Sequence, residues 1–266
     1  MSLKDRLRKK LEREEKTYES EQLMKEKRSE EYEVLEEVFD KSTLMTIYDF
    51  MNDGTIKEIY GVVNSGKESR IYWGIGPNDE EIAIKIFLTV SAEFRKGRLP
   101  YIIGDPRFKN VRKNLRNLVF LWAQKEFKNL NSAYEAKVRV PRPIAIKNNV
   151  LIMEFIGRNG VSAPLLKEVD LKNPGRMYRM VLLHVKRLYR GAGLVHGDLS
   201  EYNIMVWRGR PVLFDLSQAV PIEHPSSDQF LFRDLENINR YFSRIGVNVI
   251  DIEELYRVVT GEAAVR

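Results

Sequence analysis

The apolar pattern of this chain changes its period about halfway along the sequence. Residues 56–63, 70–74 and 81–87 are short runs rich in Ile, Val and Tyr, separated by Gly, Pro, Asn and Asp. Such runs predict a three-stranded antiparallel meander. After Gly157 most apolar residues recur at helical spacing instead, which predicts a second, helical lobe. The expected fold class is therefore α+β with two lobes.

Longer segments set the expected boundaries of these lobes. Residues 113–130 carry apolar residues at positions i, i+3, i+4 and i+7, which predict a helix packed on the core. Residues 149–155 predict a buried strand that leads out of the first lobe. We expect a charged N-terminal arm at 1–41, a sheet lobe at 42–156 and a helical lobe at 157–266.

Composition excludes several kinds of chemistry. The 266 residues contain no cysteine, so disulfides, thiolate metal sites and cysteine nucleophiles are impossible. No apolar run approaches the ~20 residues that cross a bilayer, and no leader pattern is visible, so we expect a cytoplasmic protein without membrane contact. Residues 1–40 hold 10 Lys and Arg against 13 Asp and Glu, which leaves a net charge of +9 on residues 41–266. Such a basic body attracts polyanions.

The segment His196 to Asn203 reads HGDLSEYN. It keeps the H-x-D-L-x-x-x-N spacing of phosphoryl-transfer loops, in which the Asp accepts a hydroxyl proton and the Asn holds magnesium. Asp198 is therefore the predicted catalytic base and Asn203 a predicted metal ligand. The alternative interpretation is a loop with a helix-capping Asp and a turn Asn.

Two more charged residues fit the same chemistry. Asp215 ends an apolar run 12 residues after Asn203, where a second magnesium ligand is expected. Lys85 ends the run IAIK, which matches the V-A-I-K strand whose Lys contacts the α- and β-phosphates. Such a Lys needs a buried carboxylate, and Glu126 in the predicted helix is the candidate. Its neighbours Gln124 and Lys125 are expected to face solvent.

A glycine-rich flap is the third expected part. Gly61 and Gly66 occupy the outer positions of G-x-G-x-x-G around Val63, and this altered flap would place Ser65 against the phosphates. The stretch also reads as a Walker G-x-x-x-x-G-K loop. However, Glu68 stands where that loop needs Ser or Thr, and a strand rather than a helix follows.

The run VLIMEFI at 150–156 is typical of a strand that enters a two-lobe hinge. There the backbone of Glu154 and Ile156 would bind an adenine edge, and Met153 would close the back of the pocket. Taken alone the run is a buried strand, and the preceding motifs turn it into a binding-site hypothesis.

Together these motifs resemble the RIO family of atypical serine protein kinases, in the archaeal-type branch that lacks an N-terminal winged-helix domain. The resemblance covers about residues 42–260. It implies a protein-kinase-like fold with an antiparallel sheet lobe and a truncated helical lobe. Its specific marks are Ser65 to Glu68, Tyr101 to Phe108, Trp122 to Leu130 with Lys125-Glu126, His196 to Asn203, His224-Pro225, Phe230-Leu231 and Arg233-Asp234.

The resemblance also implies roles for individual residues. Lys85 would bind ATP phosphates, Asp198 would be the base, and Asn203 and Asp215 would bind Mg²⁺, with Mn²⁺ as a possible substitute. It allows a transient aspartyl-phosphate on Asp215. Family members phosphorylate serine, including their own, hydrolyse ATP and act in maturation of the small ribosomal subunit, so its precursor is the expected partner.

The sequence departs from ordinary protein kinases near the catalytic loop. Gly197 replaces the Arg that reads activation-loop phosphate, and Ser200 stands where a phosphate-binding Lys is usual. We expect Ser200 among the nucleotide contacts nonetheless. Only 51 residues follow Asp215, without A-P-E, which predicts a helical lobe lacking an activation segment and a peptide groove.

A basic segment at 94–117 holds eight Lys and Arg against Asp105 alone, interleaved with aromatic residues. It is either a solvated insertion or a contact for ribosomal RNA phosphates, with Ser91 as a candidate self-phosphorylation site. On the second interpretation, exchanging Arg107 and Lys109 for Glu would weaken pre-ribosome binding.

Two other functions compete with the protein kinase hypothesis. A small-molecule kinase of the aminoglycoside or choline type would share the loop from His196 to Asn203, but the sequence after Asp215 lacks the Trp and second acid that often follow there. The other alternative is an assembly factor that binds pre-ribosomes and uses ATP only as a release switch.

Overall fold

A five-stranded antiparallel sheet forms the first lobe of the chain, in a computed structural model that describes residues 39–88, 98, 100–105, 107 and 115–261. The strand order is β1-β2-β3-β5-β4, and every neighbouring pair is antiparallel. The strands are β1 (Glu58–Ser65), β2 (Ser69–Ile75), β3 (Glu81–Phe87), β4 (Pro143–Lys147) and β5 (Val150–Glu154).

The predicted meander is confirmed as β1 to β3, and the predicted strand at 149–155 is β5. The edge strand β4 was not predicted. Its five residues begin with a proline and are half-buried or exposed along their whole length, so they lack the alternation that marks a strand with one buried face.

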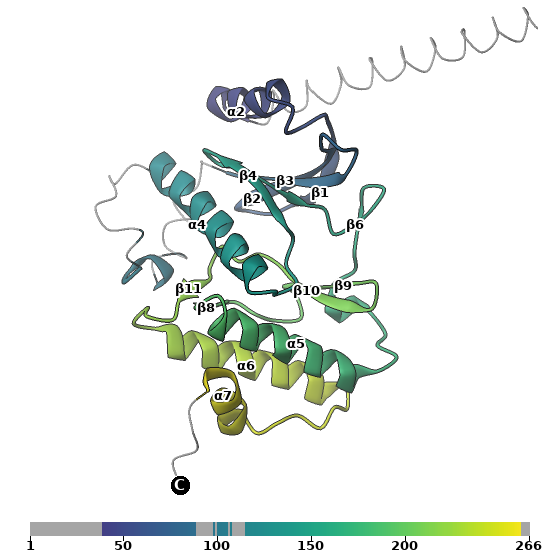
Figure 1. Ribbon diagram of the computed structural model, residues 1–266, viewed down its shortest axis with the longest axis vertical. Helices are drawn as coiled ribbons and strands as arrows, with labels where there is room; N and C mark the ends of the chain where they lie inside the picture. The colour runs from purple at the N-terminus through teal and green to yellow at the C-terminus, as the bar shows by residue number, and fades with distance from the viewer. Residues whose placement is uncertain (1–38, 89–97, 99, 106, 108–114, 262–266) are drawn as a thin grey trace, which may run out of the picture.

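Two helices pack on this sheet (Figure 1). Helix α2 (Lys41–Asn52) begins at Asp40, whose carboxylate accepts the Thr43 N–H at 2.9 Å, and it buries Ile47 and Phe50 in a cluster with residues of β3 and β5. Helix α4 (Leu115–Glu135) buries Trp122 and Leu130 in the larger cluster that extends into the second lobe. It ends five residues beyond the predicted limit of 130.

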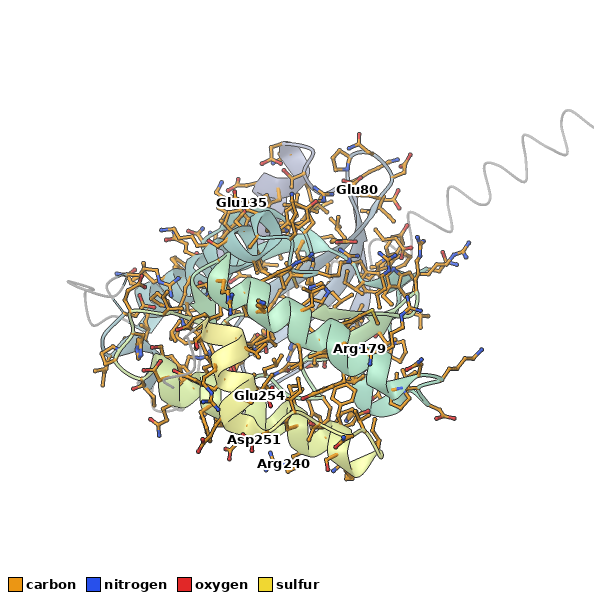
Figure 2. All side chains as sticks on the ribbon, turned by 60° about the horizontal axis from the view of Figure 1, so that its bottom comes forward. Glu80, Glu135, Arg179, Arg240, Asp251 and Glu254 are labelled. Carbon is orange, nitrogen blue, oxygen red and sulfur yellow. The ribbon has the colours of Figure 1, made fainter. Side chains whose placement is uncertain are left out.

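The second lobe is built on three helices, α5 (Pro174–Arg190), α6 (Ser227–Arg244) and α7 (Ile252–Thr260). Figure 2 shows them from the lower end of the molecule, with the exposed Arg179 on α5, Arg240 on α6 and Glu254 on α7. The inward face of α6 includes the fully buried Leu235 and Phe242.

Short strands and one 3-10 turn connect these helices. A hairpin precedes the lobe, and two small strand pairs frame its upper side (Figure 1). After β10 the chain reaches α6 through β11 alone. These elements are β6 (Gly157–Arg158), β7 (Val161–Ser162), η2 (Leu166–Glu168), β8 (Leu194–Val195), β9 (Ile204–Trp207), β10 (Arg210–Leu213) and β11 (Val220–Pro221).

Across the described ranges, no helix combines the length and apolarity that a membrane span requires.

A histidine of α5 ties the second lobe to the segment between α4 and β4. The Nδ1 atom of His184 accepts the Arg139 N–H at 3.3 Å. Burial, reinforced by Arg187 and Arg139, lowers the pKa of His184 to about 4. The imidazole is therefore neutral near pH 7, and protonation would break this hydrogen bond.

We expect His184→Asn to remove part of the pH dependence of stability. The unfolded chain binds the His184 proton below about pH 6.5 and the folded chain only near pH 4, so wild-type stability falls as the pH is lowered across this window. The wild-type advantage over the variant should shrink from pH 7 to pH 4, by at most about 1.4 kcal/mol per pH unit. Urea denaturation at several pH values measures this difference, and a constant difference would contradict the prediction.

Candidate active site between the lobes

Three ionisable side chains from separate elements meet between the two lobes. Lys85 on β3 donates to both carboxylate oxygens of Glu126 on α4 at 2.8 Å, and to Oδ1 of Asp215 after β10 at 2.9 Å. Lys85 is 5% exposed and Glu126 1%. The ion pair predicted between Lys85 and Glu126 is thus present, and pairing is what allows charged groups to be buried.

The ionisation of this cluster follows from its contacts. Burial would lower the pKa of Lys85, but the carboxylates of Asp215 and Glu126 raise it above its ordinary value. Desolvation would raise the pKa of Asp215, but Lys85 and a hydrogen bond from Ser217 lower it to about 2. An ammonium and an ionised Asp215 carboxylate therefore face each other at neutral pH.

The backbone at Asp215 has an unusual conformation. Its φ is 58°, in the left-handed region that residues other than glycine seldom adopt. Such a residue costs about 1–3 kcal/mol and is typical of functional sites. Here the turn places a partly exposed carboxylate at the end of a buried strand.

The loop after β8 brings Asp198 and Asn203 together. The Asn203 amide donates to the Asp198 carbonyl at 2.7 Å and to its Oδ2 at 3.3 Å, and the Gln218 amide approaches the same Oδ2 at 3.4 Å. Desolvation, with Asp215 nearby, raises the pKa of Asp198 although His196 opposes the effect. A carboxylate with a raised pKa is a better proton acceptor than an ordinary one.

A buried aspartate on α6 holds this loop in place, although no sequence motif predicted this role. Asp234 accepts the backbone N–H groups of Gly197 and Leu199, both at 2.8 Å. Arg233 donates to the Gly197 carbonyl and to the Tyr101 hydroxyl. Burial raises the pKa of Asp234 to about 7. The sequence signal was the pair Arg233-Asp234, noted only as a mark of resemblance.

The oxygen atoms of this site suit a magnesium–nucleotide complex. Mg²⁺ prefers oxygen ligands and is commonly held by one or two protein side chains together with substrate phosphates and water. The Asp215 carboxylate and the Asn203 amide oxygen could supply such ligands, because the Asn203 nitrogen is turned toward Asp198. In the part of the chain that the structure describes, no three His, Asp or Glu side chains form a metal cage by themselves.

The predicted hinge residues lie on β5 and just beyond it. Met153 is 8% exposed and belongs to the core. The Glu154 side chain forms two 2.8 Å contacts with the Arg139 guanidinium. The Glu154 N–H donates to the Arg142 carbonyl, and the Ile156 carbonyl accepts from Ala163. An adenine contact in this hinge would therefore use the Glu154 carbonyl and the Ile156 N–H.

The two predicted serine contacts are less closely tied to the cluster. Ser65 is exposed at the end of β1, next to the turn in which the Gly66 N–H donates to the Ser69 carbonyl at 2.9 Å. The Ser200 hydroxyl accepts the Tyr202 N–H at 3.3 Å and so closes a local turn in the loop after β8.

The expectation that Lys125 faces solvent is wrong. Its side chain is 1% exposed, donates to the Ser217 carbonyl at 3.0 Å and lies 4.3 Å from the Trp122 ring centroid. The chain after Asp215 covers this face of α4, and Asn129 also donates to carbonyls there. Burial lowers the pKa of Lys125 well below its usual value.

The basic segment 94–117 is described only in part, and Ser91 and Lys109 lie outside the described residues. Arg98 is 3% exposed, pairs with Glu68 and lies 4.3 Å from the Trp122 ring centroid. Arg107 binds both oxygens of Asp105 and donates to Asn129 at 2.7 Å. Both arginines stabilise the folded chain through these contacts, so a substitution of Arg107 would not test phosphate binding alone.

A two-lobed scaffold with the Lys85–Glu126 pair, the Asp198 loop and Asp215 defines a protein-kinase-like phosphotransferase. Residues 70–255 match the RIO domain model of the RIO1 type. The chain is 40% identical to the RIO-type serine/threonine-protein kinase Rio1 of Haloferax volcanii. The 239 aligned residues cover 90% of this chain and 81% of the relative. The chain therefore belongs to the RIO family of serine/threonine kinases.

Two other similarities agree with this assignment. The Rio1 kinase of Methanocaldococcus jannaschii is 36% identical over 246 residues, which cover 92% of this chain and 83% of that one. The fold matches the Rio2 kinase of Chaetomium thermophilum, solved as an ADP/Mg²⁺-phosphoaspartate complex, with a TM-score of 0.61. That match is 22% identical and covers 82% of this chain and 66% of the Rio2 chain.

We expect Glu126→Gln to destabilise the fold by about 1–3 kcal/mol, because it removes one charged partner of the buried Lys85, which keeps Asp215 as its other partner. Chemical denaturation measures this loss. Glu135→Gln, an exposed change on the same helix, is the matched control and should alter stability by less than about 0.5 kcal/mol. Equal effects of the two substitutions would contradict the assigned role of Glu126.

Proposed function

We propose that this kinase transfers the γ-phosphoryl group of ATP to serine hydroxyls, including its own, and also hydrolyses ATP. The observation that carries the proposal is Lys85, which bridges Glu126 and Asp215 at 2.8 and 2.9 Å between the lobes. In kinases the Lys of such a pair contacts the α- and β-phosphates. Ser65 in the flap, Met153 beside the adenine, and Ser200 would complete the nucleotide contacts.

Asp198 is the proposed base. Its carboxylate accepts the proton of the attacking hydroxyl while the γ-phosphorus–oxygen bond to ADP breaks. The Asn203 and Gln218 amides hold Asp198 in position. Asn203 and Asp215 would hold Mg²⁺, which neutralises charge on the phosphate oxygens when it is bound.

We also infer that Asp215 accepts the phosphoryl group transiently. Its low pKa keeps the carboxylate ionised, and the related Rio2 structure contains a phosphoaspartate. An Asp215 oxygen would form the bond to phosphorus as ADP leaves, and water would later release phosphate and restore the carboxylate. ATP hydrolysis would follow from these two steps.

The proposed partner is a precursor of the small ribosomal subunit, which family resemblance and the basic body of the chain support. One experiment tests the function and separates its forms. The protein is incubated with γ-labelled ATP and Mg²⁺, with and without small-subunit precursors, and label on protein is compared with free phosphate. We expect both products, and more turnover with precursors.

Free phosphate without labelled protein would reduce the function to an ATP-driven release switch. The absence of both products, from a protein that binds ATP, would overturn the proposal. Label on an aminoglycoside or choline in preference to protein would favour a small-molecule kinase.

A further inference from the structure

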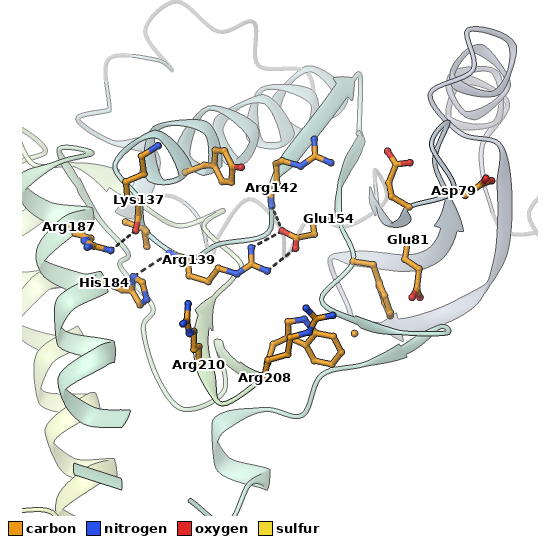
Figure 3. A pocket seen from close by; sticks show the side chains of 16 residues that line it. Asp79, Glu81, Lys137, Arg139, Arg142, Glu154, His184, Arg187, Arg208 and Arg210 are labelled. Atoms are coloured by element: carbon orange, nitrogen blue, oxygen red, sulfur yellow. Dashed lines mark hydrogen bonds and ion pairs between the residues drawn. The ribbon is translucent and has the colours of Figure 1, made fainter. Parts of the chain in front are cut away.

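A cavity of about 1030 Å³ opens behind the hinge, and we call it the hinge-back groove (Figure 3). Its walls come from both lobes, and they include Glu154 and Phe155 but none of Lys85, Asp198 or Asp215. Side chains alternate between the faces of a strand, and β3 pairs Lys85 with Leu151. Glu154 is three residues after Leu151, so its side chain and that of Lys85 lie on opposite faces of the sheet.

The lining of the hinge-back groove is rich in cations. They come from the connection between α4 and β4, from α5, and from the hairpin of β9 and β10, and Figure 3 shows them around one opening. The basic residues are Lys137, Arg139, Arg142, Arg187, Arg208 and Arg210, and the acidic ones are Asp79, Glu80, Glu81 and Glu154.

Two of the four acids, Asp79 and Glu154, are ion-paired, whereas Glu80 and Glu81 accept only neutral backbone N–H groups, so six cations face two unpaired acids in the lining. Asp79 pairs with Lys57, and the Glu80 carboxylate accepts the Asn78 N–H at 2.8 Å. Glu81 accepts the Gly160 N–H at 3.1 Å. Glu154 is paired with Arg139, which also lines the groove.

Several cations, in contrast, have capacity left for a ligand. The guanidinium groups of Arg142 and Arg210 are exposed and have no hydrogen-bond or ion-pair partner among the residues that the structure describes. Arg187 donates one N–H to the Lys137 carbonyl at 2.9 Å. Arg208 lies 5.5 Å from the Trp207 ring centroid, so its charge remains open to an anion.

We propose that the hinge-back groove binds single-stranded RNA. Its cations are spread over three elements around an open cavity at the upper end of small-ligand volumes, which suits a chain of phosphates better than one small anion. Guanidinium groups bind phosphate oxygens in pairs of hydrogen bonds.

Aromatic rings beside the cations support a nucleic acid over other polyanions. Trp207 is partly exposed and Tyr134 is 43% exposed, and both line the groove. Aromatic platforms next to a basic track are typical of single-strand binding, because each base can stack on a ring. The inference rests on the proposed function only in the choice of RNA over DNA.

The test is binding of a fluorescently labelled 12-nucleotide single-stranded RNA, followed by anisotropy over a range of salt concentrations. The double variant Arg142→Glu with Arg210→Glu should weaken binding at least 10-fold and lower the salt slope by about 1.4, for two lost phosphate contacts. The control is Arg179→Glu with Arg240→Glu, two exposed arginines of α5 and α6 with the same change in charge (Figure 2). It should change affinity less than 2-fold.

Equal weakening by both double variants would show a diffuse charge effect and overturn the groove, as would binding that neither variant changes. Tighter binding of the RNA than of a DNA strand of the same sequence supports the assignment to RNA, and equal binding overturns it. Trp207→Leu should weaken binding without changing the salt slope, and an unchanged affinity would contradict the stacking role.

The label-transfer assay separates this inference from the proposed function. Without precursors, the groove variants should retain wild-type label transfer to protein, because neither arginine belongs to the cluster around Lys85 and Arg142 forms its hydrogen bonds with Glu154 through the backbone. A wild-type protein that transfers label but binds no RNA would overturn the groove alone. A protein that binds RNA through the groove but transfers no label would overturn the proposed function alone.

Discussion

Asp198→Asn is expected to lower phosphoryl transfer from ATP by about 10²- to 10⁴-fold while ATP binding persists. The substitution removes a proton acceptor but keeps the shape of the side chain. The Asn203 amide still has the backbone carbonyl of residue 198 as its acceptor, at 2.7 Å. The loop should therefore keep its fold, and the loss should fall on the chemical step.

Single-turnover rates and nucleotide affinity, measured separately, check this expectation. The pH profile adds a second readout, because desolvation raises the pKa of Asp198 and the base must be ionised to act. Wild-type activity should fall as the pH is lowered through this pKa. The residual activity of the variant should not show this decrease. Full activity in the variant would remove Asp198 from the mechanism.

Asp215→Asn is expected to reduce magnesium-dependent turnover by about 10²- to 10³-fold. It removes the charged oxygen ligand proposed for Mg²⁺ and the proposed acceptor of the transient phosphoryl group. It also replaces the second charged partner of Lys85, at 2.9 Å, with a neutral amide. Turnover as a function of Mg²⁺ concentration and hydroxylamine-labile label on the protein are the two measurements.

The matched control is Asp170→Asn, an exposed aspartate of the second lobe. It should leave turnover within 2-fold and keep the labile label. If Asp215→Asn lost turnover but kept hydroxylamine-labile label, the phosphoryl group would reside on another carboxylate. If it kept turnover, neither proposed role of Asp215 would stand.

Local patterns predicted the parts of the fold that local forces decide. The meander was visible because its strands are rich in β-forming residues and separated by turn residues, and the Lys85–Glu126 pair because a buried lysine on a strand needs a carboxylate. Edge strand β4 was not predicted, because it forms by pairing with β5 and its own residues lack an alternating apolar pattern.

Contacts between distant segments set the remaining features. Lys125 looked solvent-facing because helical periodicity identifies one core face, whereas the chain after Asp215 covers a second face of α4. The role of Asp234 depends on loop N–H groups 35 and 37 residues away in sequence. No spacing rule contains Lys125 or Asp234. Nevertheless Lys125 holds the segment after Asp215, and Asp234 holds the loop after β8.

The backbone at Gly197 has a consequence for how this kinase can evolve. Its φ is 80°, and a Cβ there would lie 3.2 Å from the Gln218 carbonyl oxygen and 3.3 Å from the Tyr101 ring. Substitution of Gly197 by the arginine of ordinary protein kinases would thus meet steric strain before that side chain could bind any phosphate. A regulatory phosphosite of that kind is not one substitution away. We therefore expect the activity of this kinase to be regulated by partners that bind the surfaces around the cleft, and not by a phosphate-sensing residue within the loop after β8.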